Sequence, residues 1–572
     1  MTLSKHIDAE ALEHKLLKKH NGKKLSHHEQ YISKYDSDEK IPKYQIPEGS
    51  SDKELVYKYL TEELSLDGTP TLNLASFVNT AIDEVQLKLV ADNIVKNLAD
   101  NDEYPSLIDF QQRCISIISN LWHAPTTLDK TTGRQNVNTV GAATTGSSEA
   151  IMLAGLAFKK RWQEKQKAKG KSIDNPNIIM ATCAQVALEK FARYFDVENR
   201  LVPITEDSGH VIDSTRIREN IDENTIGIFV IVGSTFTGAF EPVEQISKLL
   251  DEVEAETGVD VRIHVDGASG GFVAPFVYPH LKWDFRVSRV DSINTSGHKY
   301  GLTTAGLGWV IWRDQDLLPK SLKFSLDYLG GVEETFGLNF SRAGFPVILQ
   351  YFNFLHLGRE GYTKVFNSCI ENARLFSNIL EESEYFEVLS VIHKKIENDT
   401  IKAETYTAQH HSTSKHSKLS IRNEEFYPGL PVVAFRFSKK IREEYPEIPQ
   451  RIFSTLLRNK GFIVPNYHLS PDENDKEILR VVVRTTLSLN LLEKLVADII
   501  DSIELLIESC ITVREMITAK ENTEEQNKEA IYSLLLSIAS NGVEDAKQFQ
   551  HKIIDAEGTA HGKNKKSYRG TC

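Results

Sequence analysis

Two segments, HVDGASGG (264–271) and SINTSGHKYG (292–301), decide the fold of this chain. In the first, a β-branched strand ends at Asp266. In the second, another apolar strand runs into a polar turn that carries His298 and Lys299. The carboxyl ends of parallel strands meet at one edge of a sheet, so these side chains can reach the same ligand site.

An aspartate and a lysine that face one ligand favour pyridoxal phosphate as that ligand. The Lys299 amine can form a Schiff base with the cofactor aldehyde if it is partly desolvated. A buried carboxylate at Asp266 would keep the pyridine nitrogen protonated, which makes the ring an electron sink. Each residue alone has an ordinary interpretation, as a loop cap or a surface lysine. The pair in this order indicates the cofactor.

A third segment, TTGSSEAIMLAGLAF (144–158), places a Gly-Ser-Ser turn at the start of a helix. The free N–H groups and positive dipole end of a helix bind anions, and the hydroxyls of Ser147 and Ser148 add donors. The phosphate of the cofactor is therefore expected here. An ordinary N-cap fits the same spacing and remains open. The GxGxxG pattern of dinucleotide sites is absent from this turn.

The surrounding chain alternates between helix and strand patterns. Apolar residues recur at helical spacing from Ile151 to Trp162, and short β-branched or aromatic runs follow at 226–232, 261–265 and 307–312. This alternation predicts an α/β fold with a mainly parallel sheet covered by helices.

Polar segments interrupt or flank this pattern. We expect an N-terminal arm over 1–78, partly mobile, a large cofactor-binding domain over 79–368 and a small C-terminal domain over 369–572. The small domain would contain a polar insertion at 393–427 and a charged tail at 510–572. Metal binding by His410, His411 and His416 of the insertion is the weaker alternative to a solvated loop, and no metal site is predicted. Calmodulin binding by KNKKSYR (563–569) has little support, because one tyrosine provides too few apolar anchors.

Charge and composition limit the partners. Lys and Arg number 67 against 80 Asp and Glu, which leaves a formal charge of −13 and disfavours nucleic acid. The five cysteines are widely scattered, as in a reduced protein. Neither a signal peptide nor an apolar run of membrane-spanning length is found. A cytoplasmic protein without a membrane partner is expected.

The segments HVDGASGGFVAPF, SINTSGHKYG, GSSEAIMLAG and LDGTPTLNLASF closely resemble the glutamate decarboxylases, a branch of the group II pyridoxal-phosphate decarboxylases. The resemblance runs from about residue 66 to residue 484 without the insertion, and fungal-type members are most similar. It implies the fold type I of pyridoxal-phosphate-dependent transferases, which is aspartate aminotransferase-like. Such a fold has a large, mainly parallel seven-stranded sheet domain and a smaller C-terminal α+β domain.

The resemblance also assigns cofactor residues. It makes Lys299 the Schiff-base lysine, Asp266 the partner of the pyridine nitrogen and His298 a further catalytic residue. Gln185 would stack on the ring, Ala268 would pack beneath it, and Thr235 would lie near the ring hydroxyl. Ser147, Ser148, Ser296 and His298 match phosphate-binding positions. Ser341 matches one that reaches the phosphate of a neighbouring subunit, which implies a homodimer or higher homo-oligomer with shared sites.

For the substrate, Arg480 of LRVVVR matches the arginine that holds the α-carboxylate, with Arg484 as an alternative. The distal carboxylate pocket would be formed by Ser76, Phe77, Asn97 and Asp100. Two close carboxylates cannot both stay charged, so Asp100 would be protonated or would share a proton with the substrate. The sequence departs from the usual pattern at Ser76, where threonine is common, at Gly267, where alanine is usual, and in YGLTTAGLGW (300–309).

The implied reaction converts L-glutamate to 4-aminobutyrate and CO2 and consumes one proton per turnover. The donor of that proton stays open between Lys299, His298 and a loop residue. Two other functions compete with this one: a related decarboxylase of an aromatic or sulfinate amino acid, and a non-enzymatic scaffold that binds a regulator through its tail.

Overall fold

The computed structural model describes residues 6–8, 11, 15, 43–128, 135–326, 333–396, 423–517 and 532. It divides the chain into two compact units, 1–69 and 70–572. In the first unit, α2 (Lys53–Leu64) begins after Asp52, whose carboxylate accepts hydrogen bonds from the N–H groups of Glu54 and Leu55. Most of the predicted insertion, its three histidines and most of the predicted tail, including 563–569, lie outside the described residues.

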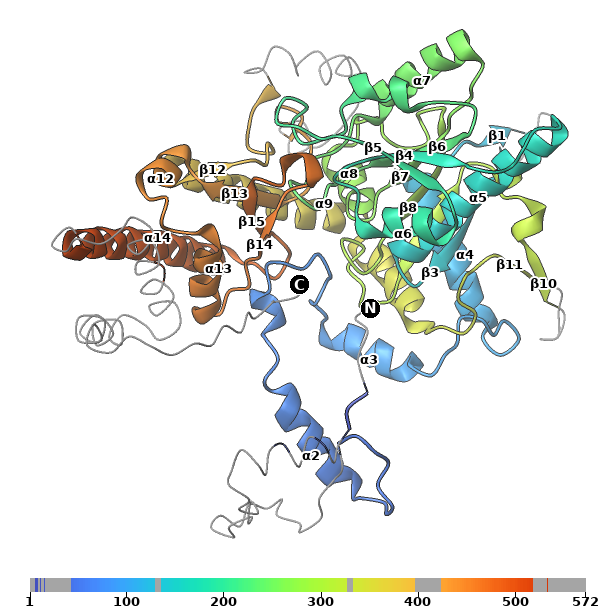
Figure 1. Cartoon of the computed structure of the whole chain (residues 1–572). Coiled ribbons are helices and arrows are strands. Elements are labelled where there is room, and N and C mark those ends of the chain that lie inside the picture. Colours follow the sequence, from blue (N-terminus) through green and yellow to red (C-terminus); the bar gives the residue numbers. More distant parts are fainter. Residues whose placement is uncertain are drawn as a thin grey trace. The chain divides into compact units, whose positions relative to one another are not determined.

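A seven-stranded sheet forms the core of the larger part of the second unit (Figure 1). Its strands lie in the order β3-β9-β8-β7-β6-β4-β5. Their bounds are β3 (Val140–Thr144), β4 (Asn177–Ala181), β5 (Glu198–Val202), β6 (Thr225–Ile231), β7 (Ile263–Asp266), β8 (Val290–Thr295) and β9 (Gly308–Trp312). β9 is antiparallel to both of its neighbours, and the other pairs are parallel. The predicted α/β fold with a mainly parallel sheet is confirmed.

Helices cover both faces of this sheet. Trp309 and Ile311 of β9 share a buried cluster with α4 (Pro105–Leu121) and α8 (Gly270–Val277). Val310 and Trp312 of the same strand pack with α5 (Ser147–Ala168) instead. Because successive side chains of a strand point to opposite faces, α5 lies on one face and α4 and α8 on the other.

The remaining helices and strands of this region complete the layers. They are α3 (Glu84–Asn93), α6 (Val186–Tyr194), α7 (Val243–Thr257) and α9 (Phe345–Glu382), with two small antiparallel strand pairs formed by β1 (Thr127–Leu128) and β2 (Gln135–Asn136), and by β10 (Phe324–Leu326) and β11 (Glu333–Thr335). α9 contains one non-helical residue, Gly358, with φ of 55°. Within the described ranges, no helix combines the length and apolar character needed to cross a membrane.

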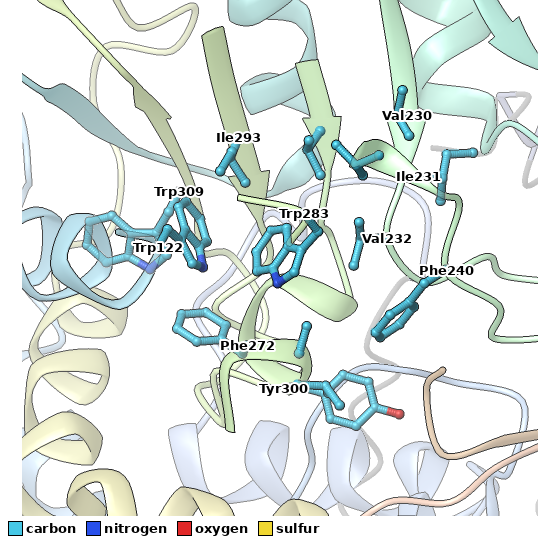
Figure 2. Packing of buried hydrophobic residues seen from close by; sticks show 14 of the residues in the cluster. Trp122, Val230, Ile231, Val232, Phe240, Phe272, Trp283, Ile293, Tyr300 and Trp309 are labelled. Carbon is cyan, nitrogen blue, oxygen red and sulfur yellow. The ribbon is translucent and has the colours of Figure 1, made fainter. Parts of the chain in front are cut away.

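Aromatic packing fixes the start of α8 (Figure 2), which begins four residues after the strand end at Asp266. The rings of Trp122 and Trp283 meet edge to face, with centroids 6.1 Å apart, and the Trp122 indole N–H donates to the carbonyl of Gly271 at 2.8 Å. A Cβ atom on Gly270 would lie 2.2 Å from the Val232 carbonyl oxygen. Only glycine allows this close approach, so the Gly-Gly pair brings α8 against the sheet.

A second, four-stranded antiparallel sheet follows in the C-terminal region, in the order β12-β13-β15-β14. It comprises β12 (Phe386–Val388), β13 (Val432–Phe437), β14 (Asn466–His468) and β15 (Glu477–Val482), with α12 (Lys439–Glu444), α13 (Gln450–Asn459) and α14 (Leu489–Ile517). Its core contains Phe376, Phe435 and Phe453, and also Leu74 from far earlier in the chain. The smaller α+β domain is confirmed. The predicted domain bounds at 78/79 and 368/369 stay predictions.

Candidate active site

A cavity of about 270 Å³ lies where β7 and β8 end and α5 begins. The predicted site residues that line it are Ser147, Ser148, Gln185, Thr235, Asp266, Ala268, Ser296, His298 and Lys299. They come from segments that are far apart in sequence. The parallel sheet therefore brings its strand ends and one helix N-terminus to the same cavity.

The N-terminus of α5 has no side-chain cap. The helix begins at Ser147, with Gly146 as the N-cap, so the alternative of an ordinary serine N-cap is wrong. The Ser147 hydroxyl instead forms a hydrogen bond of 2.7 Å with the hydroxyl of Ser296. The uncapped N–H groups and these hydroxyls together suit a phosphate.

Lys299 lies in a setting that favours its neutral amine. Its Nζ donates to the Ser269 hydroxyl at 3.3 Å and lies 5.4 Å from the centre of the Phe77 ring. Burial lowers the pKa of Lys299 below its ordinary value, and the positive charge of Arg480 lowers it further, while Asp266 opposes both. A neutral amine is the nucleophile that a Schiff base requires.

Asp266 is 4% exposed at the end of β7. Its Oδ1 accepts hydrogen bonds from Asn294 Nδ2 and from the backbone N–H of Ala268, both at 3.0 Å. Burial raises the pKa of this carboxyl group, and the charge of Lys299 and the two hydrogen bonds oppose that rise. A cation placed against Asp266 would further favour its ionised form.

His298 is held by the loop that follows it. Its Nδ1 accepts a hydrogen bond from the backbone N–H of Leu307 at 3.2 Å. Burial, with Lys299 next to it, lowers the pKa of His298 to about 4. The imidazole is therefore neutral at neutral pH and can donate through its other nitrogen.

The two candidate arginines have different surroundings. Arg480 of β15 donates to the carbonyls of Thr235 at 2.5 Å and Ala75 at 2.6 Å, and its guanidinium lies 4.9 Å from the centre of the Phe77 ring. Arg484 instead binds the loop before the large sheet, with the carbonyls of Pro70, Asn73 and Val78 and the hydroxyl of Thr80 as its acceptors. Since Phe77 also faces Lys299, Arg480 is the arginine beside the cavity.

The other predicted substrate residues do not line this cavity. Asn97 Nδ2 donates to the Ser341 hydroxyl at 3.3 Å, and Asn97 Oδ1 accepts from the N–H of Arg342. Asp100 accepts from the N–H of Glu103 within a turn. Ser76 accepts from the N–H of Val78 in the loop that carries Phe77. The chain therefore holds two groups of predicted residues. The predicted residues that line the cavity with Lys299 form the Lys299 group, and Asn97, Asp100 and Ser341 form the Asn97–Ser341 group.

Some residues that line the cavity, or that bind a residue lining it, were not predicted. Ser269, which binds Lys299, and Asn294, which binds Asp266, stand inside the two segments that carry the aspartate and the lysine, so their position was a usable signal. Glu149 likewise stands inside the quoted segment 144–158, but its contacts had no sequence signal. Its buried carboxylate accepts from the N–H groups of Thr145, Leu338 and Asn339, and only the folded chain brings these segments together.

The donor set of the cavity fits pyridoxal phosphate. A partly buried amine and a buried carboxylate line one space with an uncapped helix N-terminus and serine hydroxyls. These are the groups that an aldehyde, a pyridine nitrogen and a phosphate each require. With the fold described above, they define a pyridoxal-phosphate-dependent enzyme of fold type I.

Comparison with known proteins identifies the family. Residues 68–398 match the family model described as the pyridoxal-dependent decarboxylase conserved domain. The chain belongs to this pyridoxal-dependent decarboxylase family.

Within this family, three similar proteins are glutamate decarboxylases. The chain is 47% identical over 552 residues to a glutamate decarboxylase of Saccharomyces cerevisiae, covering 93% of this chain and 90% of that protein. It is 43% identical to glutamate decarboxylase 5 of Arabidopsis thaliana, covering 80% and 83%. Among solved structures, the glutamate decarboxylase of Lactobacillus brevis is similar with a TM-score of 0.70 and 33% identity, covering 82% of this chain and 95% of that one.

Proposed function

We propose that this chain decarboxylates L-glutamate to 4-aminobutyrate and CO2, with pyridoxal phosphate bound at Lys299, and that each turnover consumes one proton. The observation that carries the proposal is the meeting of Lys299, Asp266 and the start of α5 in one cavity, in a chain 47% identical to a glutamate decarboxylase. An aromatic or sulfinate substrate has no comparable support.

The bound cofactor supplies a protonated pyridine ring that takes up the electron pair left when CO2 departs. The chain provides the setting for that chemistry. Asp266 would stabilise a proton on the ring nitrogen, Lys299 would present its desolvated amine to the aldehyde, and the N-terminus of α5 with Ser147, Ser148 and Ser296 would hold the phosphate. Gln185 and Ala268 would contact the ring, and Thr235 would lie near its hydroxyl group; all three line the cavity.

Arg480 would orient the substrate. Each of its terminal nitrogens makes one recorded bond to a carbonyl and carries a second hydrogen, which can meet the α-carboxylate. By fixing the α-carboxylate, Arg480 would select the α-carbon bond that overlaps the ring orbitals of the cofactor and that would therefore break. Phe77, between Arg480 and Lys299, keeps water from this position. Lys299, His298 or a loop residue would supply the proton that the α-carbon takes up.

The distal carboxylate would be bound across a subunit boundary. Asn97, Asp100 and Ser341 lie apart from the cavity of their own chain, which supports their entry into the cavity of a partner. We therefore infer a homodimer, or a larger homo-oligomer, with shared sites. A cytoplasmic location is supported by Cys114, Cys183, Cys369 and Cys510, which are buried free thiols.

The experiment uses the purified full-length chain with added pyridoxal phosphate. Borohydride reduction should fix one cofactor on Lys299, as detected by peptide mass, and a Lys299→Ala variant should carry none. In a panel of glutamate, aromatic and sulfinate amino acids, glutamate should release CO2 and 4-aminobutyrate in equal amounts. Faster turnover of an aromatic amino acid would overturn the substrate assignment, and a cofactor not fixed to Lys299 would overturn the enzymatic role.

A further inference from the structure

A line of hydrogen bonds runs behind Asp266 through the buried layer between β7 and β8. His264 Nδ1 lies 2.8 Å from the Ser292 hydroxyl, and His264 Nε2 lies 2.8 Å from Asn294 Oδ1. Asn294 Nδ2 then donates to Asp266 Oδ1 at 3.0 Å. The strand register places His264 opposite Ser292 and Asp266 opposite Asn294, so all four side chains point to one face of the sheet.

The carboxylate end fixes the direction of every bond in this line. An ionised Asp266 only accepts, so the amide nitrogen of Asn294 faces it and the amide oxygen faces His264. His264 Nε2 must then carry the hydrogen, and Nδ1 accepts from the Ser292 hydroxyl. A neutral imidazole makes both hydrogen bonds, as donor to Asn294 and as acceptor from Ser292. Burial lowers the pKa of His264 to about 4, so this neutral form persists at neutral pH.

We propose that His264 and Asn294 are positioning residues, which hold Asp266 ionised and oriented towards the ring nitrogen of pyridoxal phosphate. The inference rests on the proposed role of Asp266. Both recorded hydrogen bonds to Asp266, from Asn294 and from Ala268, reach Oδ1, which leaves Oδ2 to the ring nitrogen. Without the Asn294 donor, burial would favour a protonated Asp266 that no longer stabilises a charged ring.

His264 has a distinct part in this arrangement. An asparagine amide can turn over and present its oxygen to a neighbour. The N–H of His264 accommodates only the amide oxygen, so it keeps the Asn294 nitrogen directed at Asp266. The imidazole acts through Asn294 and does not itself contact the cavity, since the described lining residues do not include it.

The chain offers a matched control for Asn294. Asn177 at the start of β4 is equally buried, its Nδ2 donates to Asp222 Oδ1 at 2.8 Å, and its Oδ1 accepts from the Thr225 hydroxyl at 2.8 Å. It has the same chemistry at the amino end of a strand, whereas the cavity lies at the carboxyl ends. Asn177→Asp and Asn294→Asp therefore impose the same isosteric change at two ends of the sheet.

The test measures the Kd of the cofactor-free protein for pyridoxal phosphate and the absorbance of the bound cofactor across pH, both without glutamate. Asn294→Asp should weaken cofactor binding by about 10- to 100-fold and move the pH at which the absorbance changes. Asn177→Asp should leave both unchanged even where it lowers Tm. Equal effects of the two variants on Kd and absorbance would overturn the inference.

Two substitutions of His264 supply an independent test if Asn294→Asp fails to fold. His264→Gln places an N–H near the position of Nε2, so cofactor binding should stay within about 3-fold of the parent protein. His264→Asn is too short to reach Asn294 and should weaken binding by about 10-fold or more. Equal binding by these two variants would overturn the role of His264. A parent protein that binds cofactor but does not decarboxylate glutamate would refute the proposed function while these comparisons still hold.

Discussion

Glu241 is a second buried carboxyl group close to the candidate site. It is 3% exposed, and its oxygens accept hydrogen bonds from the N–H groups of Ile231 at 2.6 Å and Ile212 at 3.3 Å. Burial raises the pKa of Glu241 to about 8, and the charge of Asp266 adds to this rise. The folded chain therefore holds a proton here at neutral pH.

This proton makes stability depend on pH. The unfolded chain releases it near the ordinary pKa of 4.5 and the folded chain only near 8, so between these values folding takes up a proton and stability falls as pH rises. We expect Glu241→Gln to make the slope of unfolding free energy against pH less negative by about 1.4 kcal/mol per pH unit. Urea unfolding of the cofactor-free protein between about pH 5.5 and pH 7.5 measures it.

Glu252→Gln, on the exposed side of α7, is the matched control and should leave the slope as it is. Identical slopes for Glu241→Gln and the parent protein would contradict a raised pKa at Glu241. The sequence predicted Asp266 because it ends an apolar strand, and Lys299 because it stands in the polar turn that follows another. Glu241 stands between Phe240 and Pro242 in a segment without a period, so only the folded packing reveals its burial.

At the scale of elements, strand β15 and the turn after it hold the loop at 70–80. Arg480 and Arg484 both donate to backbone carbonyls of this loop, which carries Phe77 towards Lys299. In LRVVVR, a spacing of four residues would place both arginines on one face of a strand, so the sequence could not separate their roles. The structure ends β15 at Val482, and Arg484 lies beyond it.

Lysine substitutions should separate the two arginines. Arg484→Lys replaces a planar guanidinium, which donates to several acceptors, with a single ammonium group. This change should lower the unfolding free energy by about 2–4 kcal/mol. Arg480→Lys should raise KM for glutamate by about 10-fold or more, with a smaller loss of stability, because a lysine cannot hold a carboxylate with two parallel bonds. Unfolding curves and steady-state kinetics of both variants give the comparison. A larger KM for Arg484→Lys than for Arg480→Lys would reverse the assignment.

For the whole molecule, the pattern of apolar runs predicted the large sheet and its covering helices, but not the direction of β9. A short buried strand such as GWVIW has the same sequence pattern whether it runs parallel or antiparallel. Residue patterns likewise could not predict whether the Lys299 group and the Asn97–Ser341 group lie together within one chain. Their separation within one chain is a property of the tertiary fold, and their meeting would be a property of the assembly.

Shared sites predict complementation between two inactive variants. Lys299→Ala removes the Schiff-base residue, and Asn97→Ala removes the predicted substrate contact from the other group. A hybrid dimer of these two chains would pair the intact Lys299 of one subunit with the intact Asn97 of the other at one site, while the second site carries both lesions. Hybrids isolated with two affinity tags should show about half the activity of the parent dimer. If each site were formed within one subunit, every site of the hybrid would carry one lesion, and its activity would be only the mean of the two variants measured alone.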